Sequence, residues 1–208
     1  MQLILLVTTF HESKFVPVAV GLFGLGMGYF VWGGKTFFGF PPDDPDDPAR
    51  NREINRSIGL WGIWMPGFMQ FITGVYLWIG LTWFSGVFTE KPLYMAALAF
   101  TAYGVHWFVL GHKRYIGSDP RPDAWMAIAF SVLSVLGVFV FADANDYPVM
   151  ILFIGLSLIY LTEVPTRFTG SAGLERLYGL WQLLTGAWLM YLVVGFVGEI
   201  ALERNWLF

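Results

Sequence analysis

The sequence predicts an all-α integral membrane protein whose six transmembrane helices form one bundle. Its composition is the first reason: of 208 residues, 56% are hydrophobic and only 13% are charged, and the mean hydropathy is +0.60. A soluble domain of this length carries far more charge. The second reason is that the charges are gathered in short blocks between long apolar runs, so no soluble domain is expected beside the bundle.

Six apolar runs mark the expected helices within a single domain over 1–208. A helix needs about 20 apolar residues to cross a bilayer, and its backbone must satisfy its own polar groups there. Pro92 and Pro148 stand where helices three and five begin, and Gly33 and Gly34 end the first run. The runs are 17–32, 58–81, 93–111, 124–142, 149–164 and 177–198.

The basic residues predict the orientation. The loops after helices one, three and five hold most of them, whereas the other side holds only Lys14, Lys91 and Arg204. Because basic loops stay in the cytoplasm, both termini are expected outside it, in a plasma or inner membrane. The run over 1–10 lacks a basic start and a cleavage site, so we expect it to be retained. The basic side holds Lys35, Arg50, Arg52, Arg56, Lys113, Arg114, Arg121, Arg167 and Arg176.

Several functional classes find no support in the sequence. The net charge of −3 does not favour nucleic acid, and without cysteine there is no thiol chemistry. No Ser-His-Asp, HExxH or phosphate-loop pattern appears, and His11, His106 and His112 form no metal-ligand spacing, so we predict no catalysis, metal or cofactor. The aspartate-rich stretch over 39–55 lacks EF-hand spacing and is interpreted as a solvated loop.

Helices two and six share a pattern. Gln70, Thr73 and Gly74 match Gln182, Thr185 and Gly186 in the order Q-x-x-T-G. Both helices run in the same direction, so the pattern predicts a parallel repeat of helix hairpins, as transporters use around a central pathway. A chance match in an apolar composition is the alternative.

Polar side chains at membrane depth are costly, which makes them candidates for a solute pathway. Each could instead tie helices together by hydrogen bonds, and His106 is either a pH switch or a packed side chain. Glu163 lies near a predicted helix end, so we expect no proton relay. The glycines over 21–28 allow either close helix packing or a pore-lining backbone. The polar candidates are Gln70, Thr73, Thr101, Tyr103, His106 and Gln182.

Three stretches of these helices resemble the acetate uptake transporter family. They are the glycine-rich 17–27, the glycines and Gln70 over 62–74, and Ala-Phe-Thr-Ala-Tyr-Gly-x-x-Trp over 99–107. The resemblance implies a homohexamer with one solute pathway in each protomer. It also implies an apolar constriction near Leu25 and Tyr103, with Leu158 as the residue expected from helix five. Val16 and Ala19 replace an Asn and a Pro of the family pattern, which bears on the substrate.

A second resemblance is to the urea and amide channels, which are also six-helix homohexamers. The stretch over 119–125 is similar to their Asp-x-Arg-Pro-x-x-Trp loop, and Gln182 falls where they have a glutamate. Helix five departs from them, with Phe153, Leu156 and Tyr160 in place of tryptophans. The predicted orientation agrees with this family rather than with the first.

The sequence therefore predicts a membrane channel or transporter for a small solute, with the lipid bilayer and copies of itself as its other partners. Acetate or a similar short monocarboxylate is the first choice. Burying its charge without a fixed cation is costly, so urea or a short amide is the alternative. A non-transporting subunit of a larger membrane complex is the third possibility.

Overall fold

The computed structural model describes residues 16–202, and this part of the chain is helical without strands. It contains six helical segments long and apolar enough to span a membrane, which confirms the predicted fold class. The run over 1–10, His11, Lys14 and Arg204 lie outside the described residues. The elements are α2 (Val16–Phe38), α3 (Pro48–Gly62), η1 (Ile63–Phe68), α4 (Met69–Trp83), α5 (Pro92–Ile116), α6 (Asp123–Asp143), α7 (Tyr147–Thr169) and α8 (Ala172–Leu202).

The helices extend past the apolar runs at their polar ends. α2 continues through Gly33 and Gly34, and α3 already begins at Pro48, where Asp47 accepts a hydrogen bond from the Arg50 amide at 2.9 Å. The prediction of a loop over 39–55 is therefore wrong from residue 48 onward, where α3 begins. Hydropathy detects only the part of a helix that lies in hydrocarbon, whereas proline at the first helical position and an aspartate cap start a helix in water.

The second span is one long helix, Pro48–Trp83, interrupted by a π-helical turn at η1. Pro66 lies inside this turn, where its missing N–H and its ring disrupt the regular α-helical ladder. α2 packs closely against the turn: a Cβ on Gly24 would lie 2.5 Å from the Met65 carbonyl oxygen. All four glycines of this run face neighbouring helices, as close packing requires: Gly21, Gly24, Gly26 and Gly28.

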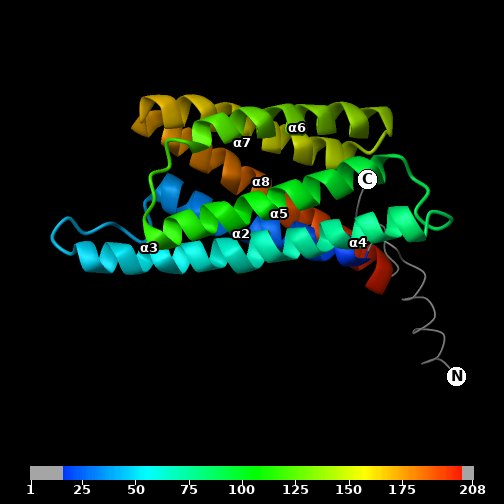
Figure 1. Ribbon diagram of the computed structural model, residues 1–208, viewed down its shortest axis with the longest axis horizontal. Helices are drawn as coiled ribbons and strands as arrows, with labels where there is room; N and C mark the ends of the chain where they lie inside the picture. The colour runs from blue at the N-terminus through cyan, green and yellow to red at the C-terminus, as the bar shows by residue number, and fades with distance from the viewer. Residues whose placement is uncertain (1–15, 203–208) are drawn as a thin grey trace, which may run out of the picture.

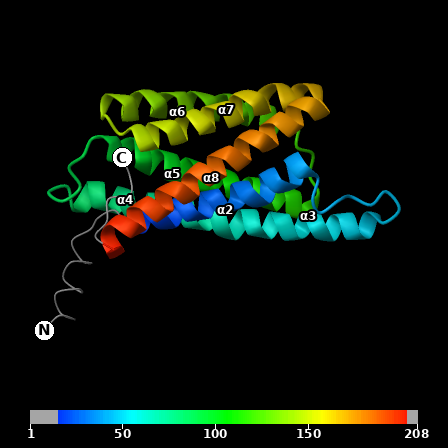
Figure 2. The same cartoon turned by 180° about the vertical axis from the view of Figure 1, so that it is seen from behind.

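The helices lie side by side along the long axis of the molecule, with α6 and α7 forming one side of the bundle and α3 and α4 the other (Figures 1 and 2). α2 packs mainly on α8, α4 on α5, and α6 on α7. The start of α2 and the end of α8 lie at the same end of the molecule. We call the other end, where α2, α5 and α7 finish, the basic end. α4 and α8 run in the same direction, as a parallel repeat requires, and the repeat itself stays a prediction.

Candidate functional site

An apolar cavity of about 850 Å³ opens at the end of the bundle opposite the basic end. Three helices line it along their length, each with side chains one turn apart. On α2 these are Val18, Leu22 and Leu25. On α5 they run from Leu93 to Tyr103, and on α7 from Val149 to Leu156. A spacing of three or four residues keeps them on one helix face, so the cavity follows α5 inward for roughly 15 Å from its first turn.

Leu25, Tyr103 and Leu156 form the deep end of the apolar cavity. Each is the last residue of its helix to line the cavity, and each side chain is at most 2% exposed. We call these three the constriction layer. Gln70 of α4 also lines the cavity and is equally buried.

The ring of Tyr103 is held from two sides. Its hydroxyl shares a hydrogen bond of 2.9 Å with Ser134 of α6, whose own hydroxyl lies 2.7 Å from the Phe130 carbonyl oxygen. The ring stacks parallel to Tyr160, with centroids 5.8 Å apart. Packing and a hydrogen bond therefore both fix the orientation of the Tyr103 ring at the deep end of the cavity.

An aromatic layer follows one turn further along the same three helices. Tyr29, Trp107 and Tyr160 lie four residues beyond Leu25, Tyr103 and Leu156, respectively, and are also buried. Tyr29 and Trp107 meet edge to face with centroids 5.7 Å apart. With the constriction layer, these rings separate the apolar cavity from the basic end.

Four buried polar atoms on Tyr29, Gln70, Trp107 and Gln182 have no hydrogen-bond partner in the part of the chain that the structure describes. They are Oη of Tyr29, Oε1 of Gln70, Nε1 of Trp107 and Oε1 of Gln182. The two amide oxygens are free acceptors, the indole nitrogen is a free donor, and the tyrosine hydroxyl can act as either. A buried donor or acceptor without a hydrogen bond costs free energy. A polar solute that supplies the missing partners would relieve that cost.

A second cavity, of about 590 Å³, opens at the basic end. It shares no lining residue with the apolar cavity and begins one turn beyond the aromatic layer, at Trp32 on α2 and Leu110 on α5. We call it the basic cavity. Its walls carry six cationic side chains and three carboxylates: Lys35, Arg52, Arg56, Lys113, Arg114, Arg167, Asp43, Asp123 and Glu175.

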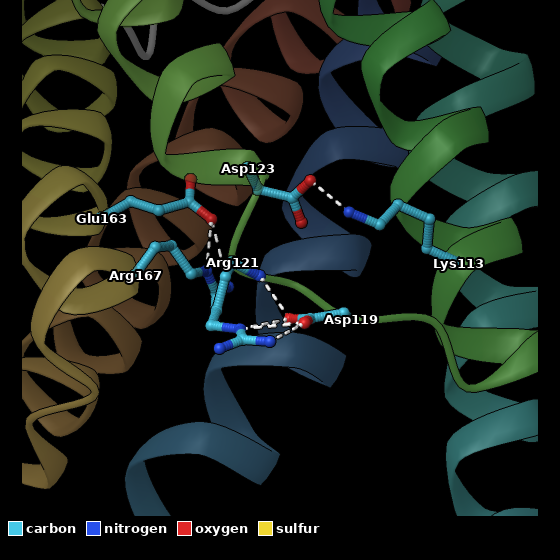
Figure 3. A network of polar contacts seen from close by, with 6 residues as sticks. All are labelled: Lys113, Asp119, Arg121, Asp123, Glu163 and Arg167. Atoms are coloured by element: carbon cyan, nitrogen blue, oxygen red, sulfur yellow. Dashed lines mark hydrogen bonds and ion pairs between the residues drawn. The ribbon is translucent and has the colours of Figure 1, made fainter.

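A buried ion pair connects the basic cavity to the interior. Glu163 of α7 is fully buried, and Arg167, one turn later, donates from Nε and Nη2 to its Oε1, each at 3.1 Å (Figure 3). Arg167 also lines the basic cavity. Beside this pair, Lys113 of α5 binds Asp123 at the start of α6. An ionised pair inside a transmembrane helix is costly, which makes it a functional candidate.

The loop between α5 and α6 is held by a local ion pair. Nε of Arg121 donates to Oδ2 of Asp119 at 2.8 Å, and the Arg121 amide donates to Oδ1 at 2.9 Å (Figure 3). These bonds lower the pKa of Asp119 to about 2. They favour the carboxylate form, so Asp119 stays ionised at lower pH than a free aspartate does.

No family model matches this chain, and no curated protein matches its sequence. The chain shares its fold with a bacterial acetate channel. The match to that structure, SatP, has a TM-score of 0.67 and 21% sequence identity, and covers 92% of this chain and 96% of that one. The resemblance to acetate transporters predicted from sequence therefore extends to the fold.

Of the predicted site residues, three line the apolar cavity and two are buried without lining it. Leu25, Gln70 and Tyr103 line the apolar cavity. His106 is buried beside the aromatic layer, and the centroid of its ring lies 4.6 Å from the centroid of the Phe130 ring. Gln182 is buried on α8, where its Cβ lies 3.0 Å from a Cβ built on Gly33.

The other predicted residues lie away from the cavity walls. Thr73 donates to the Pro17 carbonyl at 3.0 Å, and Thr101 donates to the Ala97 carbonyl at 2.8 Å while accepting from Trp78 at 3.0 Å. The bonds from Thr73 to Pro17 and from Trp78 to Thr101 join α4 to α2 and to α5.

Leu158 is half-buried and does not line the apolar cavity, whereas Leu156 does. Side chains two positions apart on a helix differ by about 200° in direction, so Leu158 points away from the constriction layer.

Two features of the site were not predicted from the sequence. Glu163 was expected near a helix end, because α7 was expected to stop at residue 164 rather than at Thr169. The pattern Glu-x-x-x-Arg, with partners one helical turn apart, could have revealed the pair. The convergence of cationic side chains from four helices on one cavity had no signal in the sequence, since these residues are far apart along the chain.

Proposed function

We propose that this protein conducts a small solute through the bilayer, along a path from the apolar cavity to the basic cavity. The arrangement of α2, α5 and α7 carries this proposal. Each of the three contributes, in order, apolar cavity wall, constriction layer and aromatic layer, and each then reaches the basic cavity. Two cavities opening from opposite ends, with a thin barrier between them, are typical of a gated membrane pathway.

A short monocarboxylic acid such as acetate is the solute we favour. The free acceptor on Gln70, in the wall of the apolar cavity, fits the O–H of a neutral carboxylic acid, and the free donor on Trp107, in the aromatic layer, fits the C=O of an acid further along the path. The basic cavity has six cationic side chains against three carboxylates, an excess that attracts the anion formed after the proton is lost. The fold shared with an acetate channel agrees with this choice.

Urea or a short amide is the second candidate. The same donor and acceptor fit an amide group, and a neutral solute avoids the cost of taking a charge across the constriction layer. Flux of urea and of acetate should differ in their response to pH, because only acetate changes its charge.

The test is uptake of labelled acetate and labelled urea into proteoliposomes at about pH 5.5 and about pH 7.5. Tyr103→Trp enlarges the barrier in the constriction layer and should abolish flux. Leu98→Trp adds the same ring to an exposed face of α5 and is the matched control. Empty liposomes measure the leak of neutral acetic acid through lipid.

Acetate flux that rises at the lower pH, exceeds the lipid leak and is lost only in Tyr103→Trp supports the monocarboxylate proposal. Urea flux that is insensitive to pH would assign the pathway to amides instead. If neither solute moves faster than in empty liposomes, the transport proposal fails. A non-transporting role in a larger membrane complex would then take its place.

A further inference from the structure

The basic cavity contains three guanidinium groups that form no ion pair among the described residues. Its three other cations have carboxylate partners, in the pairs Lys35–Asp43, Lys113–Asp123 and Arg167–Glu163. The unpaired groups come from two elements that are distant in sequence, α3 and α5, and they are Arg52, Arg56 and Arg114.

Two of these guanidinium groups are held in place by aromatic rings. Arg114 lies over the ring of Trp32, 4.8 Å from its centroid, and donates from Nε to Asn55 at 3.0 Å. Arg56 lies 5.6 Å above the ring of Tyr115. Stacking occupies the flat face of a guanidinium and leaves its edge donors available, which suits bidentate binding of an oxyanion.

The preference for basic residues on one side of a membrane does not account for this arrangement. Arg50 and Arg176 follow the same preference, but neither lines the basic cavity. The cavity is also large: its 590 Å³ lies within the range of pockets that hold drug-sized ligands. A two-carbon acid would occupy little of it.

We propose that the basic cavity binds a small phosphate-bearing anion, such as a phosphate monoester or a diphosphate, and that the bound anion blocks the pathway. Several planar forks around one cavity match the oxygens of phosphate, which carries more charge than a carboxylate. Trp32 lies in the cavity wall and contacts Trp107 of the aromatic layer, with centroids 5.1 Å apart. An occupant therefore lies directly over the barrier; this blocking role rests on the proposed transport function, whereas the binding site does not.

Binding is tested on purified full-length protein in phosphatidylcholine nanodiscs, by following the unfolding temperature during titration with inorganic pyrophosphate at constant ionic strength. We expect a saturable rise with pyrophosphate and none with acetate at equal ionic strength. Arg56→Gln with Arg114→Gln should weaken binding by roughly tenfold or more, since two charge-assisted contacts are lost. The matched control, Arg50→Gln with Arg176→Gln, removes the same charge from the same end and should leave affinity within about twofold.

No saturable effect, or an equal loss in the control variant, would overturn the site and leave only a diffuse surface charge. Phosphate can come from solution or from a lipid headgroup, so the titration is repeated with phosphatidic acid in the nanodisc. A weaker apparent affinity for pyrophosphate would assign the site to the headgroup, and an unchanged one would assign it to a soluble anion.

Blocking is tested in proteoliposomes by adding pyrophosphate to the basic end and measuring solute flux. Inhibition in the wild type that is lost in Arg56→Gln with Arg114→Gln supports the blocking role. Solute flux that pyrophosphate does not reduce would overturn that role. If pyrophosphate binds but no solute moves, the transport proposal fails while the binding site stands.

Discussion

Glu163 and Arg167 show at the residue scale how a membrane helix accommodates charge. Glu163 has no exposed surface, and Arg167 satisfies one of its oxygens while reaching the basic cavity with the rest of its guanidinium. Neither residue is stable alone at this depth, since removing one partner leaves a buried charge uncompensated. The pair therefore connects the interior of the bundle to the basic cavity.

Replacing one partner of this pair should be more harmful than replacing both. We expect Glu163→Leu or Arg167→Leu alone to lower the free energy of unfolding by about 3–5 kcal/mol, and the double variant to recover much of that loss. Thermal unfolding of the four proteins in one detergent measures the coupling. Single and double effects that simply add would show that the two side chains act independently.

Asp146 offers a pH test at the mouth of the apolar cavity. It caps α7 by accepting from the Val149 amide at 3.2 Å, and burial raises its pKa. The folded state therefore holds this proton at pH values where the unfolded chain has lost it, and stability falls as pH rises through that window. Stability becomes constant above the pKa that Asp146 has in the folded state.

Asp146→Asn keeps a capping side chain and cannot ionise. We expect the variant to gain in unfolding temperature relative to the wild type as pH rises through the window above the normal aspartate pKa. A temperature difference that does not change with pH would show that Asp146 does not titrate as proposed.

At the scale of elements, glycines set how closely α2 approaches its neighbours. Gly24 faces the π-helical turn η1, where a Cβ would lie 2.5 Å from a carbonyl oxygen and 2.6 Å from the Cβ of Met69. Gly34, on the same helix, has nothing within 4 Å of the position a Cβ would take. The two positions separate packing from helix propensity within one element.

Gly24→Ala should destabilise the protein by about 1–3 kcal/mol, because backbone rather than a movable side chain must give way. Gly34→Ala should leave stability unchanged or raise it by up to about 1 kcal/mol, through the higher helix propensity of alanine. Thermal unfolding of both variants checks this pair of expectations. Equal effects would show that the close contact of α2 with η1 is not important for stability.

The whole molecule has two unlike ends, and this asymmetry predicts its orientation. The basic cavity lies at one end, and the start of α2 and the end of α8 lie at the other. By the positive-inside rule, we expect the basic end to face the cytoplasm and the opposite end to face outward.

The chain has no cysteine, so single cysteines can report this orientation. Ser85 lies exposed between α4 and α5, and Ser118 lies exposed between α5 and α6 at the basic end. A membrane-impermeant thiol reagent should label Ser85→Cys in intact cells, but Ser118→Cys only after the membrane is opened. The reverse pattern would invert the predicted topology.

The sequence by itself determined the number of transmembrane helices and the candidacy of Leu25, Gln70 and Tyr103. Hydropathy over about 20 residues is a local property, and it is decided by what lipid accepts rather than by which helix lies alongside. For the same reason, the polar starts of helices at Pro48 and Ala172 escaped prediction.

Only the tertiary structure decided which side of each helix faces the apolar cavity and which distant residues meet. It selected Leu156 rather than Leu158, turned Thr73 and Thr101 toward neighbouring helices, and gathered arginines from α3 and α5 around one cavity. A uniformly apolar helix has no marked polar face, so its rotation is set by packing against its neighbours. That packing depends on contacts between segments far apart in sequence, which no local pattern contains.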